Sequence, residues 1–254
     1  MSTPAPRSRP PERPQLRQVD VLTRRYWACT LGDPVTLLLL LAQAPFIGYL
    51  CTLVWGSIEK DTPSLYFVLC LSAVWFGCIN ACREVVKERA ILERERFFGL
   101  SLSAYVQSKV RVLAGIGALQ VLMLLMAVEW KIALNGNFWL QLVALWGASL
   151  CGTGLGLLVS AFSKSQERAV GAIPLLILPQ ILFSEFSIPK DSFSTTVQWA
   201  ERAMPVHWAF EIFQQAASTE TDLWLLAGAL AMLPLYAGAL GLLTTTALLP
   251  RREL

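Results

Sequence analysis

The stretch that decides the fold is NACREVVKERAILERERFFGLSLSAY, residues 80–105. Nine of the fourteen residues at positions 83–96 are charged, whereas the chain of 254 residues is 55% hydrophobic and only 15% charged. Soluble domains carry charge on about a quarter of their residues. A chain this apolar is built around a membrane, and its one dense charged run must lie outside the hydrocarbon.

Long apolar runs stand on both sides of the charged stretch. A transmembrane helix needs roughly 20 mostly apolar residues. The sequence therefore predicts an all-α integral membrane protein with six transmembrane helices in the lipid bilayer. This domain would comprise residues 19–254, after a Pro- and Arg-rich tail at 1–18 that we expect to be disordered. The predicted spans lie near 35–55, 64–82, 105–128, 138–161, 170–188 and 223–249.

Basic residues are divided unequally between the segments that join these spans. Fifteen Lys and Arg fall on the side that carries both termini and the charged stretch, whereas the other side carries only Lys60, Lys131, Lys190 and Arg202. Cytoplasmic loops are enriched in Lys and Arg. We therefore expect a multi-pass protein of the inner (plasma) membrane, with both termini and the charged stretch in the cytoplasm.

An amphipathic segment precedes the first span. QVDVLTRRYWA, at 18–28, mixes apolar residues with Arg24 and Arg25, and GDPV at 32–35 is typical of a helix end followed by a new start. Aromatic residues beside arginines are typical of the membrane–water interface. We expect a helix that lies at the cytoplasmic surface of the bilayer.

Small residues gather in the fourth span, in GASLCGTGLG at 147–156. Such residues let helix backbones approach closely in lipid. Two interpretations stay open: a seam between two copies of the chain, or a contact within one copy. The string is not a phosphate-binding loop, because it lacks the required Gly-Lys-Ser/Thr ending. The helix-packing candidates are Gly147, Gly152 and Gly156.

The fifth span contains two prolines. Each proline frees a backbone carbonyl that neighbours must satisfy, so the span is expected to kink, either to line a pathway or only to pack. Glu185 is either functional, as carboxylates at membrane depth usually are, or simply at the water interface. The candidate pathway or gate residues are Pro174, Pro179, Gln180 and Glu185.

The charged stretch fits no single amphipathic helix, because its apolar residues do not share one face. Two pieces fit better: an extension of the second span, then a short helix that stops at a glycine. The charges nearly balance, which suits pairing with a specific protein surface. The alternative is a solvated loop with internal pairs. The candidate coupling residues are Glu84, Glu88, Arg89, Arg94, Glu95, Arg96 and Gly99.

Enzymatic sites are not evident. The six cysteines include no CxxC pair, so neither a disulfide framework nor a zinc site is indicated. His207 is the only histidine and has no partner at a spacing that suggests a triad. We expect this chain to carry no catalytic, cofactor-binding or metal-binding residues and to have no nucleic-acid partner.

The order of these features resembles a known family. The run at 80–109 resembles the membrane domain of ABC-transporter type-2 permeases, especially subfamily G and its bacterial relatives. LTRRYWACTLGDP is similar to that family's connecting helix, ILPQILFSEFSIP to its fifth span and MPVHWAFEIFQQ to its outer-loop helix. The residues that match the charged motif are Asn80, Ala81, Glu84, Glu88, Arg89, Arg94, Glu95, Gly99, Leu100, Ala104, Tyr105 and Lys109.

The resemblance implies the permease subunit of an ATP-driven exporter that works by alternating access. It implies a homodimer or a pair of related chains, ATP and Mg²⁺ bound by a separate ATP-binding subunit, and coupling through the 83–99 segment. A lipid-like, glycan or hydrophobic substrate is expected. Relatives often carry a small residue where Glu185 stands, so this position bears on selectivity. The alternatives are a channel or scaffold without an ATPase, or an integral-membrane enzyme.

Overall fold

The computed structural model describes residues 15–57, 62–184, 194–218 and 222–249. Within these ranges the chain is all helical and contains no strand, as the sequence predicts. Glu185 lies outside them. The elements are α1 (Gln15–Leu31), α2 (Pro34–Trp55), α3 (Pro63–Ala81), η1 (Val86–Glu88), α4 (Arg89–Phe97), α5 (Leu102–Glu129), α6 (Phe138–Phe162), α7 (Gln166–Leu182), α8 (Thr195–Arg202), α9 (Pro205–Ala217) and α10 (Leu223–Ala247).

Local sequence signals set several helix starts. Asp33 accepts a hydrogen bond from the backbone N–H of Thr36 at 3.2 Å, and Pro34 occupies the first turn of α2. Hydrogen bonds from both the side chain and the backbone of Thr36 lower the pKa of Asp33. Asn137 and Asp222 cap α6 and α10 in the same way. Each cap satisfies N–H groups that have no partner inside the helix.

Five helices in the described ranges are long and apolar enough to cross a membrane. They are Pro34–Trp55, Pro63–Phe97, Leu102–Glu129, Phe138–Phe162 and Leu223–Ala247, the second of which runs on through η1 and α4. The predicted fifth span corresponds to α7, which has 17 residues. Its first turn is polar and two prolines lie inside it, so its apolar run is shorter than the other five.

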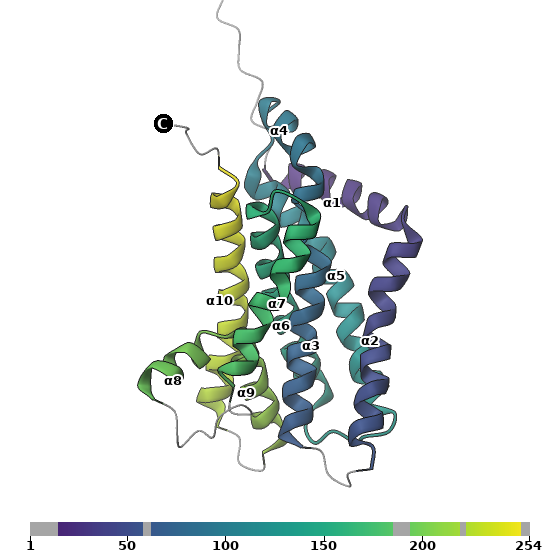
Figure 1. The fold of residues 1–254 in the computed structure, drawn as a ribbon, viewed down its shortest axis with the longest axis vertical. Coiled ribbons are helices and arrows are strands. Elements are labelled where there is room, and N and C mark those ends of the chain that lie inside the picture. The colour runs from purple at the N-terminus through teal and green to yellow at the C-terminus, as the bar shows by residue number, and fades with distance from the viewer. Residues whose placement is uncertain (1–14, 58–61, 185–193, 219–221, 250–254) are drawn as a thin grey trace, which may run out of the picture.

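The helices form an upright bundle with α3 at its centre, in contact with α6, α5 and α9 (Figure 1). At one end α1 lies across the bundle, close to α4. At the other end lie α8 and α9. The buried side of α9 packs on α3, with Phe210 edge-on to Phe67 and Phe213 beside Tyr66.

Glycines bring α6 close to α3. A Cβ at Gly77 would lie 2.0 Å from the Ser149 carbonyl oxygen, and one at Gly152 would lie 2.1 Å from the Val74 carbonyl oxygen. Gly156 faces the same helix. Of the two interpretations left open for this string, the structure therefore has the contact within one copy. On the opposite side of α6, Gly147 lies against Leu233 of α10.

We predict that Gly152→Ala destabilises the folded chain by about 1–3 kcal/mol, because backbone atoms on both helices must move apart. Gly238→Ala is the matched control, since a Cβ there meets nothing within 4 Å. Thermal unfolding in detergent, followed by tryptophan fluorescence, measures both. Equal melting temperatures for the two variants would show that the α3–α6 contact is not tight.

Candidate functional site

The charged stretch folds back onto one end of the bundle in two short pieces. After α3 ends at Ala81, a turn leads through η1 into α4. Gly99 has a positive φ of 89°, and the N–H of Leu100 bonds back to the Glu95 carbonyl oxygen at 3.2 Å. Only glycine adopts this conformation without strain. The stop at Gly99 thus turns the chain into α5.

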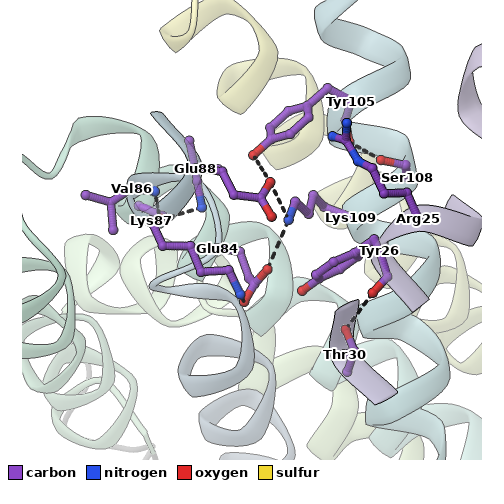
Figure 2. Close-up of polar contacts among 12 residues, drawn as sticks. Arg25, Tyr26, Thr30, Glu84, Val86, Lys87, Glu88, Tyr105, Ser108 and Lys109 are labelled. Atoms are coloured by element: carbon purple, nitrogen blue, oxygen red, sulfur yellow. Dashed lines mark hydrogen bonds and ion pairs between the residues drawn. The ribbon is translucent and has the colours of Figure 1, made fainter. Parts of the chain in front are cut away.

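A buried lysine lies at the centre of this end of the bundle. Lys109 of α5 has a side chain only 3% exposed, and its Nζ lies 3.1 Å from Glu84 Oε2 and 2.8 Å from Glu88 Oε2 (Figure 2). Lys87 pairs with the second oxygen of Glu84. Two cations and two carboxylates therefore neutralise one another, with Lys109 and Glu84 buried and Lys87 at the solvent edge, its side chain 39% exposed.

Two tyrosines complete the cluster. The Lys109 Nζ lies 3.7 Å from the centre of the Tyr26 ring, and the Tyr105 hydroxyl donates to Glu88 Oε2 at 3.2 Å. Burial, together with the negative charge of Glu84, raises the pKa of Tyr26 well above its ordinary value. Tyr26 therefore remains a neutral ring that favours the ammonium group.

The 83–99 segment is also bonded to α6. The Ser160 hydroxyl oxygen accepts from the backbone N–H groups of Val85 and Val86, both at 3.0 Å. Arg89 donates through Nη2 to the Ala161 carbonyl oxygen at 2.6 Å. These bonds satisfy backbone groups at the break between α3 and η1 and at the end of α6.

Bonds to α1 and α10 complete the attachment. Arg25 holds Glu95 with two bonds, Nη1–Oε1 at 2.6 Å and Nη2–Oε2 at 3.3 Å. Hydrogen bonding to Glu95 raises the pKa of Arg25 above its ordinary value, so the pair stays charged. Arg96 donates to the Leu248 carbonyl oxygen at 3.2 Å. The segment is thus bonded to α1, α5, α6 and α10.

The outer side of α4 is different. Phe97 and Phe98 are 91% and 86% exposed, and Ile91 is exposed beside them. Arg94 is exposed and makes no hydrogen bond or ion pair with any described residue. Adjacent exposed aromatic side chains with charges around them are typical of protein interaction sites.

The candidate coupling residues therefore divide into two groups. Glu84, Glu88, Arg89, Glu95 and Arg96 face the bundle and hold the segment in place, whereas Arg94 faces away from it. Sequence reasoning placed Tyr105 and Lys109 in the family motif without a role, and it missed the outward pair Phe97 and Phe98. A lysine inside an apolar run was a usable signal, because buried cations need carboxylate partners.

The gate candidates lie elsewhere, on α7. Pro174 is exposed, Pro179 is half-buried and Gln180 is buried. Gln180 donates to the Leu176 carbonyl oxygen at 3.2 Å, while its Oε1 has no partner among the described residues. Within the described ranges, no hydrogen bond or ion pair joins them to the charged cluster.

A buried polar chain missed by sequence reasoning runs beneath the cluster. Asn80 of α3 donates to Gln120 Oε1 of α5 at 2.5 Å, and Gln120 donates to the Leu40 carbonyl oxygen of α2 at 2.7 Å. Asn80 Oδ1 has no partner within the described ranges. The bonds link three of the helices that are long enough to cross a membrane. Over the same ranges, no three His, Cys, Asp or Glu side chains are placed to hold a metal ion.

The fold, with five helices in the described ranges that are long and apolar enough to cross a membrane, is that of a multi-pass membrane protein. Residues 17–217 match the model of the ABC-2 type transporter family, so the chain belongs to that family. Its long apolar helices make it a membrane-spanning member of that family.

Curated relatives agree with the family. The chain is 26% identical over 214 residues to the "ABC transporter ATP-binding/permease protein Rv1747" of Mycobacterium tuberculosis, an alignment covering 76% of this chain and 24% of that protein. It is 33% identical over 132 residues to "ABC transporter G family member 7" of Arabidopsis thaliana, covering 49% of this chain and 18% of that protein. It is 22% identical over 204 residues to the "ABC transporter eupT" of Phoma sp., an alignment covering 77% of this chain and 14% of that protein. The chain spans about a quarter or less of each of these relatives.

We predict that Lys109→Met destabilises the chain by about 3–5 kcal/mol, because Glu88 loses its cation and the buried Glu84 keeps only the exposed Lys87. The matched control is Arg111→Met on the same helix, whose pair with Asp20 is exposed and should contribute no more than about 1 kcal/mol. Thermal unfolding of both variants in detergent measures the difference. A Lys109→Met variant as stable as Arg111→Met would contradict the assigned role of the cluster.

Proposed function

We propose that this chain is the permease subunit of an ATP-driven exporter and that a separate ATP-binding subunit docks on the outer side of α4. One observation carries the proposal: the 83–99 segment is bonded on its inner side to four helices and presents Phe97, Phe98 and Arg94 outward. A segment attached in this way can pass a push to several spans together.

The mechanism follows from those bonds. ATP and Mg²⁺ would be held by the partner, whose closure displaces α4. Arg25 passes the displacement to α1, Lys109 to α5, and Arg89 to α6. Charge-assisted bonds between rigid elements transmit motion better than a flexible loop. The outcome is alternating access, with the spans opening outward.

A topology of six crossings is supported by α7. Five crossings would put α4 and the end of α10 on opposite sides of the membrane, yet Arg96 of α4 bonds to the Leu248 carbonyl oxygen just after α10. An even number of crossings is needed to put α4 and the end of α10 on the same side. As the sixth crossing, α7, with 17 residues, would be about 25 Å long. That is close to the hydrocarbon thickness. Both termini would then lie in the cytoplasm of a cell whose inner (plasma) membrane holds the protein.

The substrate pathway is proposed to form between two copies, or between this chain and a related one. Leu175, Leu178 and Leu182 leave one side of α7 apolar and exposed. Pro174 is exposed on the same helix. With Pro179 and Gln180, this helix would line a path for a lipid-like, glycan or hydrophobic substrate; the candidate Glu185 follows it in the sequence, outside the described residues. Export is the direction implied by the family resemblance.

Docking is tested by removing the aromatic pair. Phe97→Ala/Phe98→Ala should lower the ATP-binding subunit recovered with the tagged chain, and the ATPase activity of the eluate, by about tenfold or more, because central aromatic contacts dominate interfaces. Trp130→Ala/Trp224→Ala is the control, since these side chains are equally exposed (87% and 90%) at the opposite end. Equal recovery from both variants would place the docking surface elsewhere.

Orientation is tested with a native thiol. Cys29, on α1, is exposed and the other five cysteines are buried. A membrane-impermeant maleimide should label Cys29 only after intact cells are permeabilised. A Cys29→Ser/Ser194→Cys variant, which moves the thiol to the start of α8, should be labelled in intact cells. The reverse pattern would invert the proposed topology.

A further inference from the structure

A groove lies between α6 and α10 at the α4 end of the bundle. It begins where α6 and α10 separate: a Cβ at Gly154 would lie 2.7 Å from Leu240, so the two helices touch there. One turn further on, Leu158 of α6 and Leu243 of α10 line an open cavity of about 290 Å³.

The first part of the groove is apolar. Its walls include Phe162 and Leu243, which are 60% and 53% exposed although they belong to membrane-spanning helices. Thr246 is the one polar residue in its lining, and its hydroxyl already donates to the Leu243 carbonyl oxygen. This part can accept a hydrocarbon chain and offers little to a polar ligand.

The second part is basic. A cavity of about 330 Å³ shares Phe162 with the first part and lies under α4, where Arg89, Arg96 and Lys164 line it. Glu93 is the only carboxylate in the lining, so cations outnumber it three to one. Arg89 and Arg96 each donate one N–H group to a carbonyl oxygen. The other N–H groups of a guanidinium can bond a ligand. No carboxylate among the described residues pairs with Lys164.

We infer that this groove binds one anionic phospholipid, with its phosphate group at Arg89, Arg96 and Lys164 and an acyl chain along Leu158, Phe162 and Leu243. The basic part matches the anionic headgroup and the apolar part matches the acyl chain. The two parts adjoin, as the headgroup and the acyl chain do in the lipid. Each cavity also has, or nearly has, the volume of an ordinary ligand site. The basic part lies at the ends of α6 and α10, where a headgroup would lie in the bilayer leaflet on that side.

This lipid would also stabilise the coupling segment. Arg89 and Arg96 are the residues that join α4 to α6 and α10. A phosphate group between them would neutralise two like charges and connect the same three helices. The inference concerns the chain itself and does not depend on an ATP-binding partner, so it can be tested on the chain alone.

The test is native mass spectrometry of the full chain in neutral detergent, titrated with phosphatidylglycerol or with phosphatidylcholine of the same acyl chains. Wild-type chain should retain one phosphatidylglycerol at least about tenfold more tightly than phosphatidylcholine. Lys164→Glu should weaken that binding by about fivefold or more, since one basic residue near a headgroup contributes about that factor. Arg168→Glu is the matched control, because Arg168 is also exposed and lies outside the groove.

A second pair of variants tests the apolar part. Leu243→Trp should fill the groove and reduce retention of both lipids. Leu242→Trp, at the preceding position and outside the lining, should not. Neither Lys164 nor Leu243 uses its side chain in a bond that holds the fold, so folding is expected to survive.

Three results would overturn the inference. Equal loss from Lys164→Glu and Arg168→Glu would mean diffuse surface attraction only. Displacement of the lipid by glycerol phosphate at equal concentration would mean a site for a small soluble anion. Unchanged phosphatidylglycerol binding by Lys164→Glu would mean that the basic part of the groove does not hold the headgroup.

Discussion

The end of the bundle that carries α1 and α4 depends on one buried cation. Lys109 lies between Glu84 and Glu88 with a Tyr26 ring against it. Neither the lysine nor the Glu84 carboxylate is stable there alone, because an unpaired buried charge costs several kcal/mol. Since the four residues come from α5, the α3–η1 break, η1 and α1, those elements must stay together. The bonds of Arg25, Arg89 and Arg96 extend the same unit to α4, α6 and α10.

This arrangement separates two tasks within one charged stretch. The inner side chains fix the position of α4, while Phe97, Phe98 and Arg94 remain available to another protein. A surface that receives force from a partner has to be attached firmly on its other side. The α3–α6 contact at Gly77 and Gly152, and the Asn80–Gln120 bond between that contact and the charged segment, supply the rigid body to which the segment is attached.

Much of the fold was predictable from the sequence, because the length of apolar runs is a direct physical requirement of the bilayer. The predicted α7 span was the weakest, since its prolines and polar first turn shorten the apolar run. The charged stretch was recognisable, but the direction of each side chain was not. Glu84 and Arg94 belong to the same charged run, and only the position of Lys109 in space distinguishes their roles. Likewise, the sequence alone allowed Gly152 to face another copy of the chain, and only the structure shows that it lies against Val74.

The central claim is that α4 moves as one body with the helices to which it is bonded. The most direct test is the distance between spin labels at Arg24 on α1 and Glu93 on α4, measured by double electron–electron resonance in the chain assembled with an ATP-binding partner. The account predicts one narrow distance distribution that shifts by less than about 2 Å between the nucleotide-free and ATP-trapped states. A broad distribution, or a larger shift on trapping, would contradict it.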